Sequence, residues 1–268
     1  MTESNLSISD RPLSDLLQNS LTSTPCVNVR KNAKVRVVTG MLVQYLETFT
    51  DSVLVRDDLK PMGVIGGREI IQGVYKNPSS DFFEMKQVED IVDDRLNIAS
   101  PNISLKNLIS LWRDVGRAFA VIDMGNDDYS VISVKKLLEI GINNPCEFNI
   151  SEIPKKKIIT FDEDATFGDV IKLMLENRTR KILLDGTNQF INDRIIIETI
   201  EKFNYLLDVD KFLEIPTSVV ALEDAKIVSG DLNISDISKT MYEMSQPLII
   251  HEDRVISPWD VCMALGKS

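Results

Sequence analysis

The feature that most constrains this 268-residue chain is an internal repeat. A tetrapeptide of the pattern apolar, any residue, acidic, apolar occurs four times, as LSDL, VEDI, ISEI and FLEI. The acidic residues are Asp15, Asp90, Glu152 and Glu214, which lie 75, 62 and 62 residues apart. A period of this size is typical of a chain that repeats one supersecondary unit along its length.

The sequence after each tetrapeptide predicts the same order of elements: strand, helix, strand, strand, helix. In the first repeat, an extended piece at Val27–Val29 precedes the amphipathic run VRVVTGMLVQYLETF, with Val37, Met41, Tyr45 and Thr48 or Phe49 on one helical face. Two apolar strand segments around a charged turn at residues 57–60 follow, and REIIQGV closes the repeat as a helix. In the fourth repeat SVVAL is expected as the first strand and PLIIHEDRVIS as the hairpin.

Each repeat has an apolar sheet face that it cannot cover alone, so consecutive repeats are expected to pack in pairs. The predicted fold class is α+β, with sandwich-like βαββα repeats paired into two modules. The expected boundaries are a tail at 1–10, a first pair at 11–140 (repeats at about 11–78 and 85–140), a linker at 141–149, and a second pair at 150–268 (repeats at about 150–205 and 210–266).

Composition excludes several classes of protein. The net charge of −11 argues against sequence-independent binding to DNA or to an anionic membrane surface. No stretch approaches the roughly 20 apolar residues that span a bilayer, and no signal peptide is evident at the N-terminus. Cys26, Cys146 and Cys262 form no metal-binding or disulfide pattern and are expected to be small buried residues. We therefore expect a cytoplasmic protein without a metal site or a membrane segment.

The stretch LIIHEDRVISPWDV holds the single histidine, His251, close to Ser257 and Asp260. These residue types could form a hydrolytic triad. However, the hairpin position of His251 is filled by other residue types in the other repeats, and no G-x-S-x-G motif surrounds Ser257. We therefore expect no catalytic residues and no enzymatic activity, and interpret His251 as a residue at the end of a strand.

With these repeats the sequence resembles the cystathionine-β-synthase (CBS) domain family over roughly residues 10 to 266, most clearly in ATFGDVIKLMLENRTRKILLDG. The resemblance implies tandem pairs of repeats, called Bateman modules. Proteins of this kind bind adenine nucleotides or related adenosyl compounds in clefts between paired repeats. They act as sensors that alter a partner or an attached domain.

The family motif Gly-apolar-apolar-Thr/Ser-x-x-Asp lies where the last strand meets the last helix. The fourth repeat, RVISPWD, is nearest to it, because the hydroxyl and the acid are both present as Ser257 and Asp260. The other repeats depart from the motif: GVIGGRE has Glu69 as its acid, SVISVKK has Ser133 but Lys136 in place of the acid, and QFINDRI has Asn192 and Ile195. Lys136 removes a ribose acceptor, so the first pair is expected to bind a different ligand or none, and Glu69 could instead pair with Arg68.

In the fourth repeat, Ser257 and the start of the helix could bind a phosphate or hydroxyl group, and Asp260 could accept the ribose hydroxyls. Adenine would lie between Val219 and Leu248. The alternative is an ordinary helix start, with Ser257 as N-cap, Pro258 at the first helical position and Asp260 favourable to the helix dipole.

Cations for a phosphate are expected from the stretch ENRTRK, namely Arg178, Arg180 and Lys181. Their alternative role is that of a solvated helix end. A second basic run, Lys155 to Lys157, is interpreted as a solvated entry to a strand.

The sequence therefore predicts a non-catalytic regulatory sensor that needs no cofactor and binds AMP, ADP, ATP or S-adenosylmethionine as a regulatory ligand. A homodimer and an unknown effector protein are expected as partners. One alternative is a degenerate scaffold that binds no ligand. Another is a nucleic-acid-binding protein that uses NRTRK and PKKK, which the acidic net charge disfavours.

Overall fold

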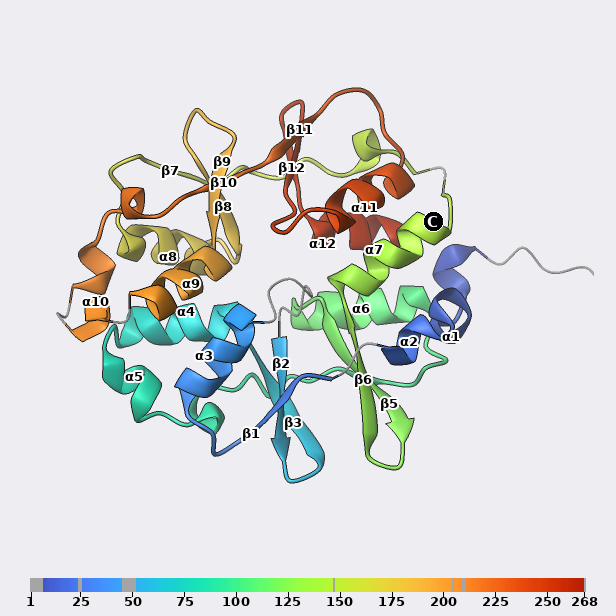
Figure 1. Ribbon diagram of the computed structural model, residues 1–268. Helices are drawn as coiled ribbons and strands as arrows, with labels where there is room; N and C mark the ends of the chain where they lie inside the picture. The colour runs from blue at the N-terminus through green and yellow to red at the C-terminus, as the bar shows by residue number, and fades with distance from the viewer. Residues whose placement is uncertain are drawn as a thin grey trace, which may run out of the picture. The chain divides into compact units, whose positions relative to one another are not determined.

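The predicted order of elements is confirmed in all four repeats of the computed structural model, which describes residues 7–23, 26–44, 52–146, 148–203, 205–208 and 211–267 (Figure 1). The first repeat contains β1 (Asn28–Arg30), α3 (Val35–Gln44), β2 (Ser52–Asp57), β3 (Lys60–Gly66) and α4 (Gly67–Lys76). The second contains β4 (Ile98–Ala99), α6 (Leu105–Val115), β5 (Phe119–Gly125), β6 (Asp128–Ser133) and α7 (Val134–Asn143). The third contains β7 (Thr160–Phe161), α8 (Phe167–Glu176), β8 (Lys181–Leu184), β9 (Gln189–Asn192) and α9 (Asp193–Lys202). The fourth contains β11 (Lys226–Val228), α11 (Ile234–Tyr242), β12 (Ile249–His251), β13 (Arg254–Ile256) and α12 (Pro258–Leu265).

Four short helices lie outside this pattern: α1 (Leu13–Leu17), α2 (Ser20–Ser23), α5 (Ser80–Glu84) and α10 (Tyr205–Asp208). In every sheet the first strand runs parallel to the first hairpin strand, and the two hairpin strands are antiparallel. The sheet of the third repeat gains a further strand, β10 (Glu223–Asp224), which pairs with β9. The predicted α+β class with βαββα repeats is therefore confirmed.

The chain divides into two compact lobes that interleave the repeats. Lobe one comprises Met1–Cys26, Arg95–Lys156 and Lys226–Ser268, and lobe two comprises Val27–Asp94 and Lys157–Ala225. Lobe one thus holds the second and fourth repeats, and lobe two holds the first and third. The lobes differ from the predicted pairs at 11–140 and 150–268, because α7 packs on α11 and α12, and α4 packs on α9. A pairing of consecutive repeats would lie between the lobes and stays a prediction.

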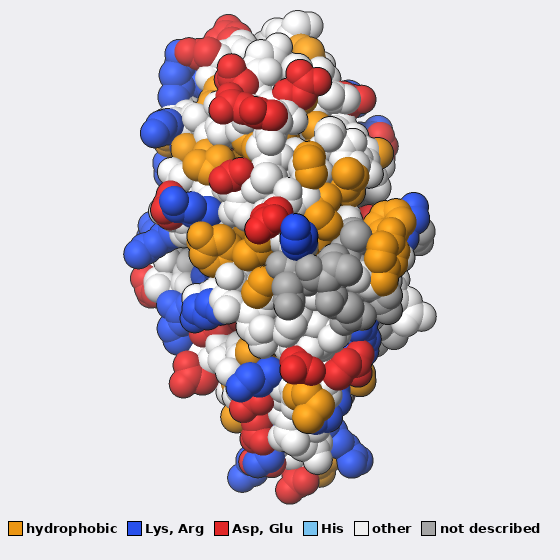
Figure 2. Space-filling view, turned by 90° about the vertical axis from the view of Figure 1, so that its left-hand side faces the viewer, with side chains coloured by type: hydrophobic (Ala, Val, Ile, Leu, Met, Phe, Trp, Pro, Cys, Tyr) orange, Lys and Arg blue, Asp and Glu red, His pale blue; other side chains and the backbone are white. Residues whose placement is uncertain are grey.

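On the face that Figure 2 shows, acidic and basic side chains both occur, with hydrophobic side chains scattered among them. Within the part of the chain that the structure describes, no helix is long and apolar enough to cross a membrane.

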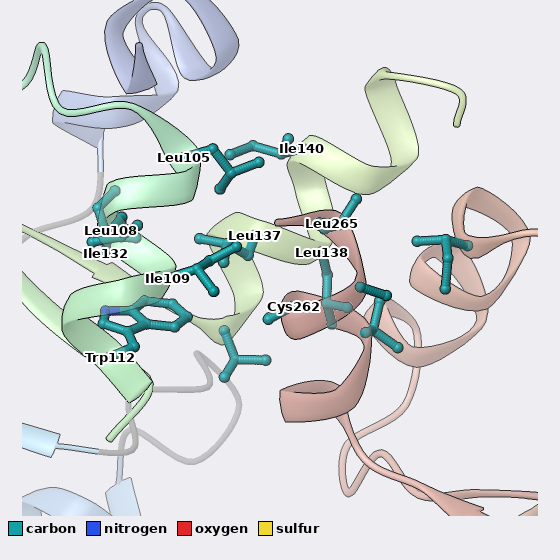
Figure 3. Close-up of a cluster of buried hydrophobic side chains, with 14 of the residues drawn as sticks. Leu105, Leu108, Ile109, Trp112, Ile132, Leu137, Leu138, Ile140, Cys262 and Leu265 are labelled. Atoms are coloured by element: carbon teal, nitrogen blue, oxygen red, sulfur yellow. The ribbon is translucent and has the colours of Figure 1, made fainter. Parts of the chain in front are cut away.

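Each lobe has its own hydrophobic core. In lobe one, α6 contributes Leu105, Leu108, Ile109 and Trp112, which lie with residues of α7 and α12 in one cluster (Figure 3). Trp112 is fully buried. Close packing requires Gly266 after α12, since a β-carbon there would lie 2.8 Å from Ile109 Cδ1. In lobe two the core lies among α3, α4, α8 and α9 and the adjoining sheets.

Three of the four leading tetrapeptides lie in docking segments, and the fourth docking segment is the 3-10 helix Thr217–Val219. LSDL lies in α1, and VEDI and ISEI form the 3-10 helices Val88–Asp90 and Ile150–Glu152. The first residue of each segment and the residue two positions before it share a pair of backbone hydrogen bonds with another repeat. The partners are the first residue of a long helix and the residue two positions before that helix. The first residue of each segment donates its amide to a backbone carbonyl at 2.8 or 2.9 Å: Leu13 to Ile103, Val88 to Ala33, Ile150 to Leu232, and Thr217 to Ala165. The acceptor always lies two residues before the helix, which is α6, α3, α11 or α8.

This docking pattern corrects the position of the fourth segment. The equivalent of the other three is the 3-10 helix Thr217–Val219, which begins five residues after the start of FLEI. FLEI itself packs its Phe212 ring on Phe167, with ring centroids 4.9 Å apart. SVVAL is consequently no strand, and β11 begins only at Lys226. The expectation of a strand at SVVAL is therefore wrong: Val219 is 55% exposed, and tertiary docking of the neighbouring Thr217 decides the local structure.

The docking segments also connect consecutive repeats. The segment that leads repeat one docks on repeat two, and the segment that leads repeat two docks on repeat one. Repeats three and four exchange their segments in the same way. Every one of these contacts lies inside one lobe.

Three smaller expectations differ from the structure. In α3 the buried face is formed by Val35, Val38 and Leu42, whereas Val37 is 49% exposed; Tyr45, Thr48 and Phe49 lie outside the described residues. The expected linker 141–149 begins inside α7, which ends at Asn143. Cys262 is buried as expected, but Cys26 and Cys146 are only half-buried.

Candidate ligand site at the fourth strand-to-helix junction

The junction of the fourth repeat runs from β13 through Ser257 into α12. Asp260 turns its carboxylate back to Ser257: Oδ2 accepts hydrogen bonds from the Ser257 amide at 2.9 Å and from its hydroxyl at 2.8 Å. Pro258 occupies the first helical position. The expectation of an ordinary helix start is therefore confirmed for these three residues, since the carboxylate satisfies a backbone N–H that the helix leaves open. The side chain of Asp260 is only 6% exposed.

The second oxygen of this buried carboxylate has a partner from far away in the sequence. Lys156 Nζ forms an ion pair with Asp260 Oδ1, and the lysine side chain remains 54% exposed. Next to it, Lys155 Nζ lies 2.5 Å from Asp253 Oδ2 in the β12–β13 turn. The hydrogen bond from Lys155 lowers the pKa of the Asp253 carboxyl. Both lysines follow the docking segment Ile150–Glu152.

This basic run was expected to be a solvated entry to a strand, but it supplies partners for two acids of the fourth repeat, Asp253 and Asp260. The two partners Lys156 and Asp260 are 104 residues apart. No local pattern joins them. The repeat was the one signal that could have predicted this contact, because the chain after each docking segment contacts a strand-to-helix junction.

At the first junction, Glu69 keeps a carboxylate but is fully engaged. Its Oε2 accepts from the Gly66 amide at 2.8 Å, and its Oε1 lies 3.1 Å from Arg68 Nε. Arg68 also binds Asp93, at 2.8 Å, and Asp93 follows the docking segment Val88–Asp90. The predicted pairing of Glu69 with Arg68 is confirmed. An adenosyl ligand would have to replace this charged pair.

At the second junction, the N-terminal part of the chain covers the motif. Lys136 Nζ lies 2.5 Å from Ser20 Oγ and 3.4 Å from Glu139 Oε2, and Ser20 donates to Glu139 Oε1 at 2.6 Å. Ser130, in the glycine position of the motif, donates to the Leu21 carbonyl at 2.6 Å. Ser133 is buried and begins α7, but its side chain makes no capping hydrogen bond. The helix α2 therefore contacts the junction through Ser20 and Leu21.

At the third junction, Asn192 Oδ1 accepts from the Ile195 amide at 2.9 Å and caps α9. Asp193 is buried, and Arg180 Nε donates to its Oδ2 at 2.6 Å. Arg180 is thus committed to an acid of its own repeat. The chain after the fourth docking segment pairs here as β10, with Glu223 opposite Phe190.

The remaining predicted site residues are distributed over both lobes. Leu248 and Asp260 are buried in lobe one, where Ser257 is half-buried, and the Leu248 carbonyl accepts from the Lys226 amide at 2.9 Å. Lobe two holds Val219, which is 55% exposed in a 3-10 helix, exposed Arg178, and half-buried Arg180 and Lys181. The ammonium of Lys181 lies 5.7 Å from the Phe190 ring centroid. A shared site for the two groups stays a prediction.

The single histidine, His251, contacts a backbone carbonyl and not Ser257. His251 is buried at the end of β12, and its Nε2 lies 3.0 Å from the Gly230 carbonyl. Among the described residues, no hydrogen bond joins it to Ser257, whose hydroxyl donates to Asp260. The interpretation of His251 as a strand-end residue is confirmed.

The chain was compared with known families, curated proteins and solved structures. Residues 150–192 match the model of the CBS domain. The comparison with curated proteins gives no match. Among solved structures, protein MJ1225 of Methanocaldococcus jannaschii, described as a candidate archaeal homologue of γ-AMPK, superimposes with a TM-score of 0.77 at 12% identity, over 94% of this chain and 99% of that one.

Two further structures are similar. An uncharacterised conserved protein of Pyrococcus horikoshii gives a TM-score of 0.55 at 13% identity, over 92% of this chain and 99% of that one. A candidate signal-transduction protein with CBS domains from Burkholderia ambifaria gives 0.42 at 17% identity, over 50% of this chain and 96% of that one.

Proposed function

We propose that this chain, which carries a CBS domain at residues 150–192 within a fold of tandem CBS repeats, is a regulatory sensor of an adenosine-containing ligand. The ligand class is AMP, ADP, ATP or S-adenosylmethionine, and the site is the fourth junction. Binding would favour one arrangement of the modules over another, and a partner protein or a homodimer would respond to the change. Such a shift requires that the ligand bind the two arrangements with different affinity.

The observation that supports this function is the state of Asp260. Its carboxylate is almost completely buried, it is held in orientation by Ser257, and its second oxygen faces an exposed lysine. A buried carboxylate is costly unless hydrogen-bond donors or cations surround it. Ribose hydroxyls are such donors, and an ionised carboxylate that is already oriented accepts strong hydrogen bonds from them. At the other three junctions the corresponding position is an acid in a local ion pair, a lysine or an isoleucine.

A second function is favoured by those same three junctions. A scaffold that binds partners without a ligand would need no open acceptor, and the second junction is covered by α2 through Ser20 and Leu21. The nucleic-acid hypothesis gains no such support, because Arg180, Lys155 and Lys156 are all paired with acids.

The experiment is a thermal-shift screen and isothermal titration calorimetry with adenosine, AMP, ADP, ATP and S-adenosylmethionine. A ligand at 100 times its dissociation constant stabilises the folded protein by about 2.7 kcal/mol. We expect at least one of these compounds to raise the melting temperature. No shift with any of them, at concentrations well above a micromolar dissociation constant, would favour the scaffold function.

A matched pair of variants assigns the site. Asp260→Asn removes the charge at the fourth junction and is expected to abolish the ligand-induced shift. Asp169→Asn is the control, because Asp169 accepts from the amide and hydroxyl of Thr166 at 3.0 and 2.7 Å in the same capping arrangement, at the start of a different helix. If both variants respond to the ligand like the unchanged protein, the site lies elsewhere.

A further inference from the structure

The inference concerns Lys156, and it rests on the proposed function. We infer that Lys156 makes the fourth junction selective for adenosine ligands that carry phosphate, because the ammonium group must leave Asp260 when ribose binds. The ligand class is then narrower: nucleotides are preferred, and adenosine and S-adenosylmethionine are disfavoured.

The carboxylate of Asp260 has too few open acceptor positions for both ribose hydroxyls while Lys156 is bound to it. An ionised carboxylate offers about four lone-pair positions on its two oxygens. Ser257 uses two of them on Oδ2, through its amide and its hydroxyl, and Lys156 uses one on Oδ1. The 2′ and 3′ hydroxyls of a ribose donate two hydrogen bonds. They can both reach this carboxylate only if Lys156 gives up its place.

Lys156 is able to move. Its side chain is 54% exposed, so the ammonium can leave the carboxylate without crossing packed residues. Lysine carries its charge on a flexible four-carbon stem, which lets the ammonium rotate to a new partner near its old one. Its neighbour Lys155 is held in the same exposed manner by Asp253. Two exposed cations therefore lie beside the junction.

The charge of the released ammonium decides the ligand class. A phosphate on the bound nucleoside gives Lys156 a new anionic partner, so the ion pair that ribose breaks is replaced by another. Adenosine offers no such partner. S-adenosylmethionine has one carboxylate, but its 5′ position carries a sulfonium where AMP carries a phosphate, and its ammonium leaves the molecule with a net positive charge. The displaced lysine therefore meets a like charge at the 5′ position, and like charges in close proximity repel.

The test is calorimetric titration of the full chain with AMP, adenosine and S-adenosylmethionine, for the unchanged protein and for Lys156→Gln, Lys156→Arg and Lys157→Gln. The unchanged protein is expected to bind AMP at least about tenfold more tightly than adenosine. Lys156→Gln is expected to weaken AMP binding about tenfold and to strengthen adenosine binding, because the competing ammonium is gone. Lys156→Arg should preserve the preference for AMP.

Lys157→Gln is the matched control, since it removes one exposed lysine next in the sequence. It should leave the ratio of AMP to adenosine affinity unchanged. The melting curve of each variant shows that it is folded. Salt provides a second readout: the AMP affinity of the unchanged protein should fall with added NaCl more steeply than that of Lys156→Gln.

The outcomes separate the two proposals. Equal binding of AMP and adenosine, unaffected by Lys156→Gln, would overturn the role of Lys156 and leave the proposed function standing. Tighter binding of S-adenosylmethionine than of AMP would do the same. Absence of binding by all three compounds would overturn the role of Lys156, and absence of binding by ADP and ATP as well would overturn the proposed function.

Discussion

Gly67 and Asp193, the first residues of α4 and α9, lie directly against each other in lobe two. A β-carbon on Gly67 would lie 2.1 Å from Asp193 Oδ2. The carboxylate is buried, and Arg180 donates to the same oxygen at 2.6 Å. It thus sits against the N-terminal ends of two helices, where the helix dipoles favour negative charge. This contact sets how closely the first and third repeats approach each other.

Gly67→Ala is therefore expected to destabilise the protein. The new methyl group has no room beside a buried carboxylate, and overpacking of this kind costs about 1–3 kcal/mol. Urea unfolding followed by circular dichroism measures the change in midpoint. Gly40→Ala in α3 is the matched control, because a β-carbon there meets no atom within 4 Å and an alanine favours the helix. A lower midpoint for Gly40→Ala than for Gly67→Ala would contradict this account.

Ser130→Ala is expected to loosen α2 from the second junction. The substitution removes the donor to the Leu21 carbonyl and leaves that buried acceptor unsatisfied, at a cost of about 1–3 kcal/mol. Hydrogen exchange at residues 20–21 should become faster. Ser133→Ala, three residues later, serves as the comparison, since its hydroxyl makes no capping bond and the change should stay within about 0.5 kcal/mol. Equal effects of the two substitutions would speak against a specific role for Ser130.

Asp169→Asn is expected to lower stability at pH 7 by about 1 kcal/mol, because Asp169 and Thr166 cap α8. The hydrogen bonds from Thr166 lower the pKa of Asp169 in the folded protein. The stabilisation by its charge is therefore complete above the ordinary aspartate pKa and is lost as the pH falls through the lowered value. Melting curves from pH 7 to pH 2 should show the difference between the two proteins shrinking. A difference that grows in acid would refute the sign.

Glu198→Gln is expected to raise the melting temperature at pH 7. Burial raises the pKa of Glu198, and the charge of Glu223 adds to this effect while Arg194 opposes it. Since the folded protein holds the proton more tightly than the unfolded chain, stability falls as the pH rises from the ordinary glutamate pKa through the raised one. The glutamine has no charge to bury, so its advantage should vanish below about pH 4.

The gain from Glu198→Gln is expected to be less than about 1 kcal/mol, because Glu198 is only half-buried and water screens its charge. Glu163→Gln, at an exposed position, removes the same charge and should leave the melting temperature nearly constant. If both variants gain equally, the cause is the net charge of −11 and not the burial of Glu198.

Much of each repeat could be predicted because the signals are local. The period of the apolar residues in "TFGDVIKLMLENRT" is that of a helix, and residues 167–176 form α8. The start of α12 could be predicted for the same reason, since Ser257, Pro258 and Asp260 satisfy the helix terminus within one turn. SVVAL shows the limit: its composition favours a strand, but the docking of Thr217 on the Ala165 carbonyl imposes a 3-10 helix.

The sequence by itself determined the four repeats, the order of their elements and the one junction that keeps both a hydroxyl and an acid, because periodicity and helix capping act over a few residues. Only the tertiary structure decided which repeats share a lobe, that α2 covers the second junction, and that Lys156 neutralises Asp260. Those contacts join residues more than a hundred positions apart, as with Lys136 and Ser20 at 116 and Lys156 and Asp260 at 104. A buried charge or polar group takes whichever partner the packing brings to it, and the packing is a property of the whole chain.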